Sequence, residues 1–374
     1  MTLSAFVKFT IITFFYIGLK AEIDLPCSEA EREILDYECT DNKPIGAGVN
    51  SVTYRVKLKN DDVEKALKIS LVDTTDKNQC PELTYLQKLQ GSKYVVKLIE
   101  SFDIKKIDGK NYLFEVLELA ENGDFESFLK NKSEFFKDDD KNLFEFSMML
   151  AEGLKEIHSK DIVHASVKPQ NIIITKDFTP KYIDFDSSVE MGTEALSRGD
   201  HLFNAPEVSL HRGEKLIWGA PQDIFSLGAT FYYMAHQKVP FDGINRYFHK
   251  RAVQRRKYII QKGINRDYIN IIQRCMQWKY DERASLETIL KLIDEAKHKP
   301  ADKIKRLDKD MVASLDNLIL EEPGWIMMDP LLLLIIIGIV VSVLSIVGIA
   351  IGCLLRRKKQ VNGAEVELYA ENNS

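Results

Sequence analysis

The stretch "IVHASVKPQNIII" (residues 162–174) decides the fold that this 374-residue sequence predicts. A helix is expected before it, over residues 143–160, because apolar residues recur there at the spacing of one helix face. These residues are Leu143, Phe146, Leu150, Leu154 and Ile157. Two short apolar strands, "NIIIT" and "KYIDF", are expected at the end of the stretch and shortly after it. The polar centre of the stretch is therefore a loop between a helix and a pair of strands.

The region before this helix is dominated by expected strands. In "SVTYRVKLK" (51–59) apolar and polar residues alternate, which is typical of a half-buried antiparallel strand. "EKALKISLV" and "NYLFEVLELA" continue as strands, with one helix expected near residues 81–90. The region after the loop is mainly helical, including residues 223–236 and 285–297. This order predicts an α+β fold in which a small strand-rich lobe precedes a larger helical lobe.

Two motifs lie on the expected strands. In the glycine loop "IGAGVNSV" (45–52), Gly46 and Gly48 would let the backbone approach an anionic group. Because a strand and not a helix follows, the loop does not fit a Rossmann or P-loop site. "ALKI" puts Lys68 on a strand beneath the glycine loop, and Glu82 in the next helix could hold its amine. Taken alone, a hairpin turn and a surface lysine are the simpler interpretations.

The motifs together occur in the order and spacing of a known family. The glycine loop and the lysine are followed by "HASVKPQN", "IDFD", "NAPE", "DIFSLG" and "YDERAS". This series resembles the eukaryotic protein kinases over residues 37–297. The resemblance implies two lobes with ATP in the cleft between them. Glu207 with Arg283, and Asp223, resemble the buried structural groups of the larger lobe.

The resemblance also implies a site for ATP and Mg²⁺. Lys68, paired with Glu82, would bind the α- and β-phosphates. Lys168 would neutralise the transferred group, and its spacing from the loop serine is similar to that of the serine/threonine subclass. Asn171 and Asp184 would be Mg²⁺ ligands, since hard oxygen atoms suit this ion. The nucleotide would be bounded by the glycine loop, two strands and the hinge after the gatekeeper Leu117, at Ile45, Gly46, Gly48, Val52, Ala66, Leu117, Glu118, Leu119 and Ala120.

Four positions depart from the family pattern. Ser166 stands where the family has an aspartate that accepts the proton of the substrate hydroxyl, and loss of such a base costs about 10²–10⁴ in rate. Ala165 replaces an arginine, so a phosphorylated activation segment would lose its cationic partner. Asp186 replaces the glycine of "DFG", and Asp200 replaces the threonine five residues before "APE". These changes predict a pseudokinase or a weakly active kinase.

The pair of Ser166 and Asp200 suggests one further hypothesis. In the family the threonine hydrogen-bonds the catalytic carboxylate, whereas here the acid and the hydroxyl have exchanged positions. Asp200 would then partly replace the missing base. The alternative, which we favour, is drift in an inactive site, because a displacement of about 1 Å can cost about 100-fold in rate.

Both ends of the sequence carry segments that predict membrane targeting. Residues 1–21 have the pattern of a signal peptide that ends at Ala21, with an uncleaved anchor as the alternative. Residues 331–355 contain no charged residue and predict a transmembrane helix. The "RRKK" that follows places the tail, residues 356–374, in the cytoplasm. Residues 298–330 are interpreted as a stalk.

These segments together place the kinase-like body in the lumen or outside the cell. If the first segment is not a signal peptide, a cytosolic body is the alternative. In an oxidising compartment, four cysteines of the body could pair in three ways, and the sequence does not choose among them. They are Cys27, Cys39, Cys80 and Cys275.

The composition limits the class of partner. The formal net charge of −5 does not fit a general nucleic-acid-binding protein. We expect a membrane-anchored domain that binds ATP and acts on, or together with, a protein partner whose identity the sequence does not give. The alternatives are an active serine/threonine kinase with altered catalytic residues and a receptor that binds its partner without nucleotide.

Overall fold

The computed structural model describes residues 23, 25–132, 135–136, 140–211, 213–241, 253–255 and 257–314. All of them belong to a single compact unit within residues 1–317. The predicted signal peptide, transmembrane helix and tail lie outside the described residues. Within the described part of the chain, no helix is long and apolar enough to cross a membrane.

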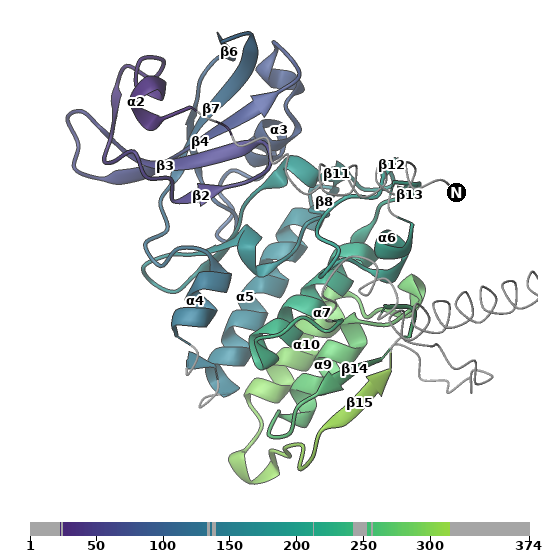
Figure 1. The fold of residues 1–374 in the computed structure, drawn as a ribbon. Helices are drawn as coiled ribbons and strands as arrows, with labels where there is room; N and C mark the ends of the chain where they lie inside the picture. The colour runs from purple at the N-terminus through teal and green to yellow at the C-terminus, as the bar shows by residue number, and fades with distance from the viewer. Residues whose placement is uncertain are drawn as a thin grey trace, which may run out of the picture. The chain divides into compact units, whose positions relative to one another are not determined.

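The small lobe is built on a seven-stranded sheet (Figure 1). The strands follow the order β1-β3-β4-β7-β5, with β2 beside β3 and β6 beside β7, and all neighbours are antiparallel. Their bounds are β1 Tyr37–Cys39, β2 Gly46–Ala47, β3 Ser51–Leu58, β4 Glu64–Val72, β5 Leu98–Ser101, β6 Lys105–Ile107 and β7 Lys110–Glu118. The helix expected near residues 81–90 is α3 (Pro81–Lys88).

Strand β3 has the alternation that its sequence predicts. Val52, Tyr54 and Val56 are buried, whereas the residues between them are half-buried. Leu58, at the end of the strand, is only partly covered. The apolar face belongs to a buried cluster of the small lobe. The glycine loop forms the exposed turn of the hairpin β2–β3.

An N-terminal cap covers the outer face of this sheet. It contains α2 (Cys27–Ala30), and a disulfide joins Cys27 to Cys39 at the end of β1. Leu25 and Ile34 are buried in the same apolar cluster as Val56 of the sheet. Each of the three pairings that the sequence left open joins all four cysteines, whereas the structure forms only the disulfide between these two. Cys80 and Cys275 are free and buried.

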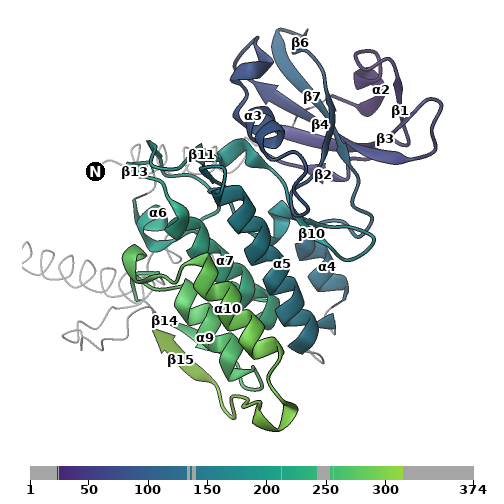
Figure 2. The ribbon, with the colours of Figure 1, turned by 180° about the vertical axis from the view of Figure 1, so that it is seen from behind.

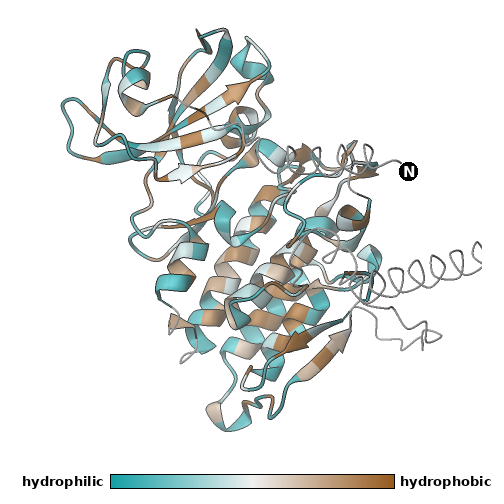
Figure 3. Cartoon of the chain, in the orientation of Figure 1, coloured by the Kyte–Doolittle hydropathy of each residue, from teal (hydrophilic) through white to brown (hydrophobic). Residues whose placement is uncertain are grey.

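The large lobe is mainly helical, as predicted, and helix α5 lies at its centre (Figure 2). Its helices are α4 Phe125–Asn131, α5 Asp140–His158, α6 Pro206–Leu210, α7 Ala220–His236, α9 Arg266–Cys275 and α10 Leu286–Lys297. Helix α5 packs against α7 and α10, and its predicted apolar stripe is buried throughout. Figure 3 shows hydrophobic and polar residues alternating along the helices of this lobe.

Short strand pairs connect these helices and carry the loop segments. The pairs are β8 Ile162–Val163 with β11 Val189–Glu190, β9 Ile172–Ile174 with β10 Pro180–Tyr182, and β12 Glu194–Leu196 with β13 Lys215–Ile217. The expected strand "KYIDF" was placed too far along the chain, because Asp184 adopts a left-handed conformation and Phe185 begins a 3₁₀ turn. The strand therefore ends before the acidic residues.

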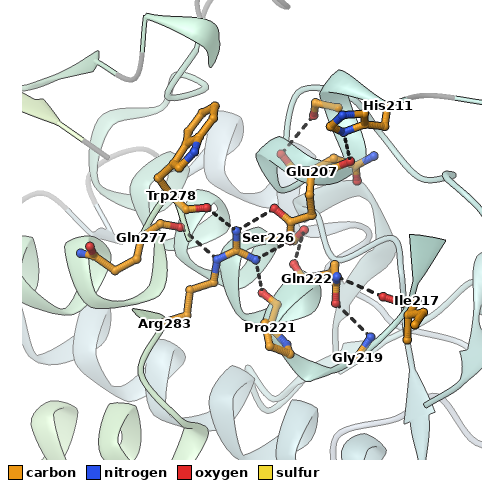
Figure 4. Close-up of polar contacts among 12 residues, drawn as sticks. Glu207, His211, Ile217, Gly219, Pro221, Gln222, Ser226, Gln277, Trp278 and Arg283 are labelled. Carbon is orange, nitrogen blue, oxygen red and sulfur yellow. Dashed lines mark hydrogen bonds and ion pairs between the residues drawn. The ribbon is translucent and has the colours of Figure 1, made fainter. Parts of the chain in front are cut away.

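The predicted structural pair of Glu207 and Arg283 ties α6 to the loop before α10 (Figure 4). The guanidinium donates to both carboxylate oxygens at 2.7 and 2.8 Å, and it also donates to the carbonyl of Pro221 at 2.9 Å. The Arg283 side chain is fully buried. A bidentate pair of this kind fixes both the position and the orientation of the two segments.

The first part of the predicted stalk is folded onto the large lobe. Strand β15 (Met311–Ser314) pairs antiparallel with β14 (Lys257–Ile260). Arg306 binds Asp140 at the start of α5, with nitrogen–oxygen distances of 2.9 and 3.2 Å. The chain from residue 298 to 314 is thus part of the body, and the remainder of the predicted stalk lies outside the described residues.

Candidate functional site

Lys68 and Glu82 form a buried ion pair beneath the sheet. Lys68 extends from β4 and its amine lies 2.5 Å from a carboxylate oxygen of Glu82 on α3. Only 6% of Lys68 and 3% of Glu82 is exposed. Burial alone would lower the pKa of Lys68, but the attraction of Glu82 and of nearby aspartates holds it well above its usual range. The amine is therefore charged and fixed in place.

The segment of Asp184, Phe185 and Asp186 closes around the same amine. Lys68 Nζ lies 3.2 Å from Asp184 Oδ1 and 3.5 Å from Asp186 Oδ2. Phe185 is fully buried against the ring of His164, and its backbone N–H donates to Glu82 at 3.3 Å. Asp186 stands at the position of the family glycine and contacts Lys68 of β4, while the Phe185 N–H attaches the segment to α3.

Glu115 is a fourth carboxylate that the sequence reasoning missed. It lies on β7 directly opposite Lys68, so the two side chains share one face of the sheet. It is fully buried, and neither carboxylate oxygen has a hydrogen-bond partner. Burial raises the pKa of Glu115 to about 7. The sequence does contain a signal for it, because Glu115 is the one charged residue inside the apolar run "YLFEVL". A charged residue in a buried strand indicates a charged partner nearby, and Lys68 was predicted on a neighbouring strand.

The loop of the opening stretch is held from below by Asp223. Its two carboxylate oxygens accept the backbone N–H groups of His164 at 2.7 Å and Ala165 at 2.8 Å. Ala165 has a left-handed φ of 59°. Within the loop, the Asn171 amide donates to the hydroxyl of Ser166 at 2.9 Å and to its carbonyl at 3.0 Å. These donations leave the side-chain oxygen of Asn171 for a cation.

Lys168 and Asp200 meet beside this loop, with 3.3 Å between the amine and the carboxylate. Burial would raise the pKa of Asp200, but the backbone N–H of Leu202 and the charge of Lys168 lower it below its usual value. Gly199 brings Asp200 to this position. Its φ is +84°, and a Cβ there would lie 2.4 Å from the carbonyl oxygen of Ala165.

The residues predicted to bound a nucleotide lie on the glycine hairpin, β3, β4 and the end of β7. Gly46 and Gly48 are exposed, as is Ile45. Ala66 and Leu117 are buried on the face of the sheet that carries Lys68. Val52 was predicted to line the nucleotide with them, but it pairs with Ile69 and is buried on the opposite face, against the N-terminal cap. Glu118 accepts from the amine of Lys181 at 2.6 Å and from the backbone of Lys97 at 2.7 Å, which fixes the start of the hinge that continues to Leu119 and Ala120.

This donor set fits a nucleotide held together with a divalent cation. Lys68 supplies a fixed positive charge, while Asn171 and Asp184 supply an amide oxygen and a carboxylate. The three carboxylates around Lys68 would repel bare phosphates, so a bound cation is needed to balance them. The arrangement can therefore position phosphate groups, but Ser166 offers no base near neutral pH.

The fold and this site define a class of protein, and comparison with known families gives the same class. The profile of the protein kinase domain matches residues 39–293. The chain therefore belongs to the protein kinase family.

Individual relatives are protein kinases from several organisms. The chain is 31% identical over 201 residues to the mitosis inhibitor protein kinase wee1 of Schizosaccharomyces pombe, covering 51% of this chain and 22% of the relative. It is 28% identical over 249 residues to the serine/threonine-protein kinase stk11 homolog of Dictyostelium discoideum, covering 65% and 41%. Sperm motility kinase 2B of Mus musculus is 30% identical over 184 residues, covering 48% and 36%. The chain spans less than half the length of each of these relatives.

Proposed function

We propose that this chain binds ATP together with Mg²⁺ and transfers phosphate slowly or not at all. The observation that carries the proposal is the position of the Lys68 amine, which Glu82 and Asp184 hold by ion pairs. Ser166 occupies the position at which the family has its catalytic base. In this proposal Lys68, Asn171 and Asp184 serve the phosphates and the metal, whereas Ser166 cannot remove a proton.

In this proposal each residue has a defined task. Lys68 holds the phosphates, and Asn171 with Asp184 holds the Mg²⁺, which neutralises phosphate charge when bound. Lys168 places a positive charge beside the loop, and this charge forms an ion pair with Asp200. The Ser166 hydroxyl accepts a hydrogen bond from Asn171 and is not basic enough to remove a proton from an acceptor hydroxyl.

The test is the thermal unfolding of the full chain with and without Mg-ATP. At a ligand concentration 100 times the dissociation constant, binding stabilises the folded state by about 2.7 kcal/mol, which gives a measurable rise in Tm. Lys68→Ala should lose this rise, whereas Lys57→Ala, a change at a partly exposed lysine of β3 that pairs with Glu38 on β1, should keep it. No rise in the parent chain would refute nucleotide binding and would favour a receptor that works without it.

We also propose that the body lies in the lumen or outside the cell, attached through a transmembrane segment at residues 331–355. The Cys27–Cys39 disulfide supports this side of the membrane, since disulfides persist in oxidising compartments. Protease protection of intact membranes, followed with a tag at the exposed residue Asp302, tests it. Digestion of the tag in sealed vesicles whose lumen is protected would contradict the proposal.

A slow serine/threonine kinase is the second candidate, because Asp200 lies in the active-site loop region and contacts Lys168. Asp200 would then serve as the replacement base. Asp200→Asn should in that case abolish phosphate transfer, while the parent chain shows slow transfer that Lys68→Ala removes. Equal rates in the parent and Asp200→Asn chains would end this candidate.

A further inference from the structure

We propose that Glu115 couples nucleotide binding at Lys68 to the uptake of a proton, so that Mg-ATP binds more tightly as the pH falls. The inference rests on the proposed binding of ATP and concerns the regulation of that site. The kinase resemblance gives this position no role. The observation that carries the inference is the location of the Glu115 carboxylate in the sheet.

Glu115 lies within β7, between β4 and β5. Lys68 stands opposite it on β4, and the uncharged Ser101 stands opposite it on β5. The carboxylate is fully buried, and neither of its oxygens has a hydrogen-bond partner among the described residues. Cys80, at the start of α3, is a neutral thiol, since burial raises its pKa to about 11. A charged carboxylate is costly in such surroundings, whereas a protonated one is much less so.

The charged groups near Glu115 come from three elements. Lys68 of β4 is a cation, whereas Glu82 of α3, together with Asp184 and Asp186 after β10, are acids. The Lys68 amine contacts these three acids at 2.5, 3.2 and 3.5 Å. An ammonium group has three N–H donors, so the three acids can occupy all of them. Glu115 therefore receives attraction from Lys68 without a hydrogen bond.

These opposing effects place the titration of Glu115 near neutral pH. Burial raises its pKa to about 7, and the attraction of Lys68 offsets only part of that rise. About half of the folded chains thus carry a proton on Glu115 near pH 7. A change in the charge around Lys68 will consequently change the protonation of Glu115.

A bound nucleotide changes this charge in one direction. ATP with Mg²⁺ keeps a net negative charge, and its phosphates would share the Lys68 amine that now attracts Glu115. Both effects disfavour the Glu115 anion, so they raise its pKa in the complex. Since the coupling is reciprocal, a proton on Glu115 strengthens nucleotide binding. The added affinity is fully present below the pKa of the free chain, and it is lost as the pH rises through the higher pKa of the complex.

Titration calorimetry of the full chain with Mg-ATP, from pH 6 to 8.5, tests the proposal. We expect the Kd to be about 3–10-fold lower at pH 6 than at pH 8.5, because one shifted group changes affinity by at most about tenfold per unit of its pKa shift. Titrations in two buffers with different heats of ionisation should show uptake of a fraction of a proton. Circular dichroism checks that each chain is folded.

Two variants assign the effect to this carboxylate. Glu115→Gln has nearly the same shape and cannot ionise, so it should bind at pH 8.5 about as tightly as the parent does at pH 6. Glu64→Gln is the matched control on β4, where the side chain is partly exposed and pairs with Arg55. It should keep the pH dependence of the parent.

Two results would overturn the coupling. One is binding of Mg-ATP by the parent with a constant Kd and no proton uptake, a result that needs no variant. The other is a folded Glu115→Gln chain with the pH dependence of the parent, because the proton would then bind elsewhere. A parent that does not bind Mg-ATP at any pH would refute the proposed function and the coupling with it, so the two kinds of failure are distinguishable.

Discussion

At the scale of single residues, the loop of Ser166 is intact around an altered centre. Asp223 holds the backbone of the loop, Asn171 bonds the serine side chain, and Lys168 remains beside it. The supporting contacts therefore do not require the carboxylate that the family has at this position. A loop of this kind can accept the family residue without rebuilding.

Restoring the acid should raise the rate of phosphate transfer. We expect Ser166→Asp to increase it by at least about 100-fold, because a positioned base contributes about 10²–10⁴. Radiolabel transfer from ATP to the chain itself and to a general acceptor protein measures this. Ser166→Asn has the same shape without a base and should remain at the level of the parent. If the aspartate and asparagine variants transfer equally, the missing base does not limit the rate.

At the scale of elements, the N-terminal cap joins α2 to the outer face of the small-lobe sheet. The disulfide between Cys27 and Cys39 closes a loop with a sequence separation of 12. Leu25, Ile34 and Tyr37 are buried beneath it. The cap thus completes the core of the sheet on the face opposite the Lys68 site, and the cross-link holds it there.

Removing the disulfide should lower the free energy of unfolding. For a loop of this length the loss is about 3 kcal/mol, mainly because the unfolded chain gains freedom. Urea unfolding of a Cys27→Ser/Cys39→Ser double variant measures it. A reductant should destabilise the parent to the same extent and leave the double variant unchanged, since Cys80 and Cys275 are already free thiols. A reductant effect that persists in the double variant would contradict this account.

At the scale of the whole molecule, stability depends on the protonation of a buried histidine. His236, at the end of α7, donates from Nδ1 to the carbonyl of Tyr232 at 2.9 Å, and its Nε2 accepts the backbone N–H of Gln261 at 3.3 Å. A proton on Nε2 would point at that N–H. Burial lowers the pKa of His236 from 6.5 to about 4. The folded body therefore keeps this ring neutral.

Stability should fall as the pH drops from about 6.5 to about 4. In this window the unfolded chain binds a proton at His236 and the folded chain does not, so the free energy of unfolding decreases by up to about 3 kcal/mol. Glu115 acts in the opposite direction, because its raised pKa makes the folded state bind a proton first. Denaturant unfolding of the parent and of His236→Gln is measured from pH 4 to 7. The difference between their free energies of unfolding at each pH gives the contribution of the histidine. Parallel stability curves would show that His236 does not titrate on unfolding.

The sequence predicted the periodic elements well, since burial of one face determines them. The stripe on α5 and the alternation in β3 are both present in the structure. The strand before Asp184 was extended too far, because its left-handed turn leaves no periodic trace. Glu115 was missed for a related reason. It matters because it lies opposite Lys68 on the neighbouring strand, and the sequence alone does not give the register between β4 and β7. The disulfide pairing likewise depends on how the cap folds back.

The attachment of β15 also has a mechanical consequence. A pull on the chain beyond Ser314 loads the four-residue pairing of β15 with β14 first, and then the bond between Arg306 and Asp140. These contacts lie on the large lobe, apart from Lys68 and from the loop of Ser166. We therefore expect β15 to detach from β14 under force before the site is disturbed. The rest of the folded body would then stay intact while this short strand pairing breaks.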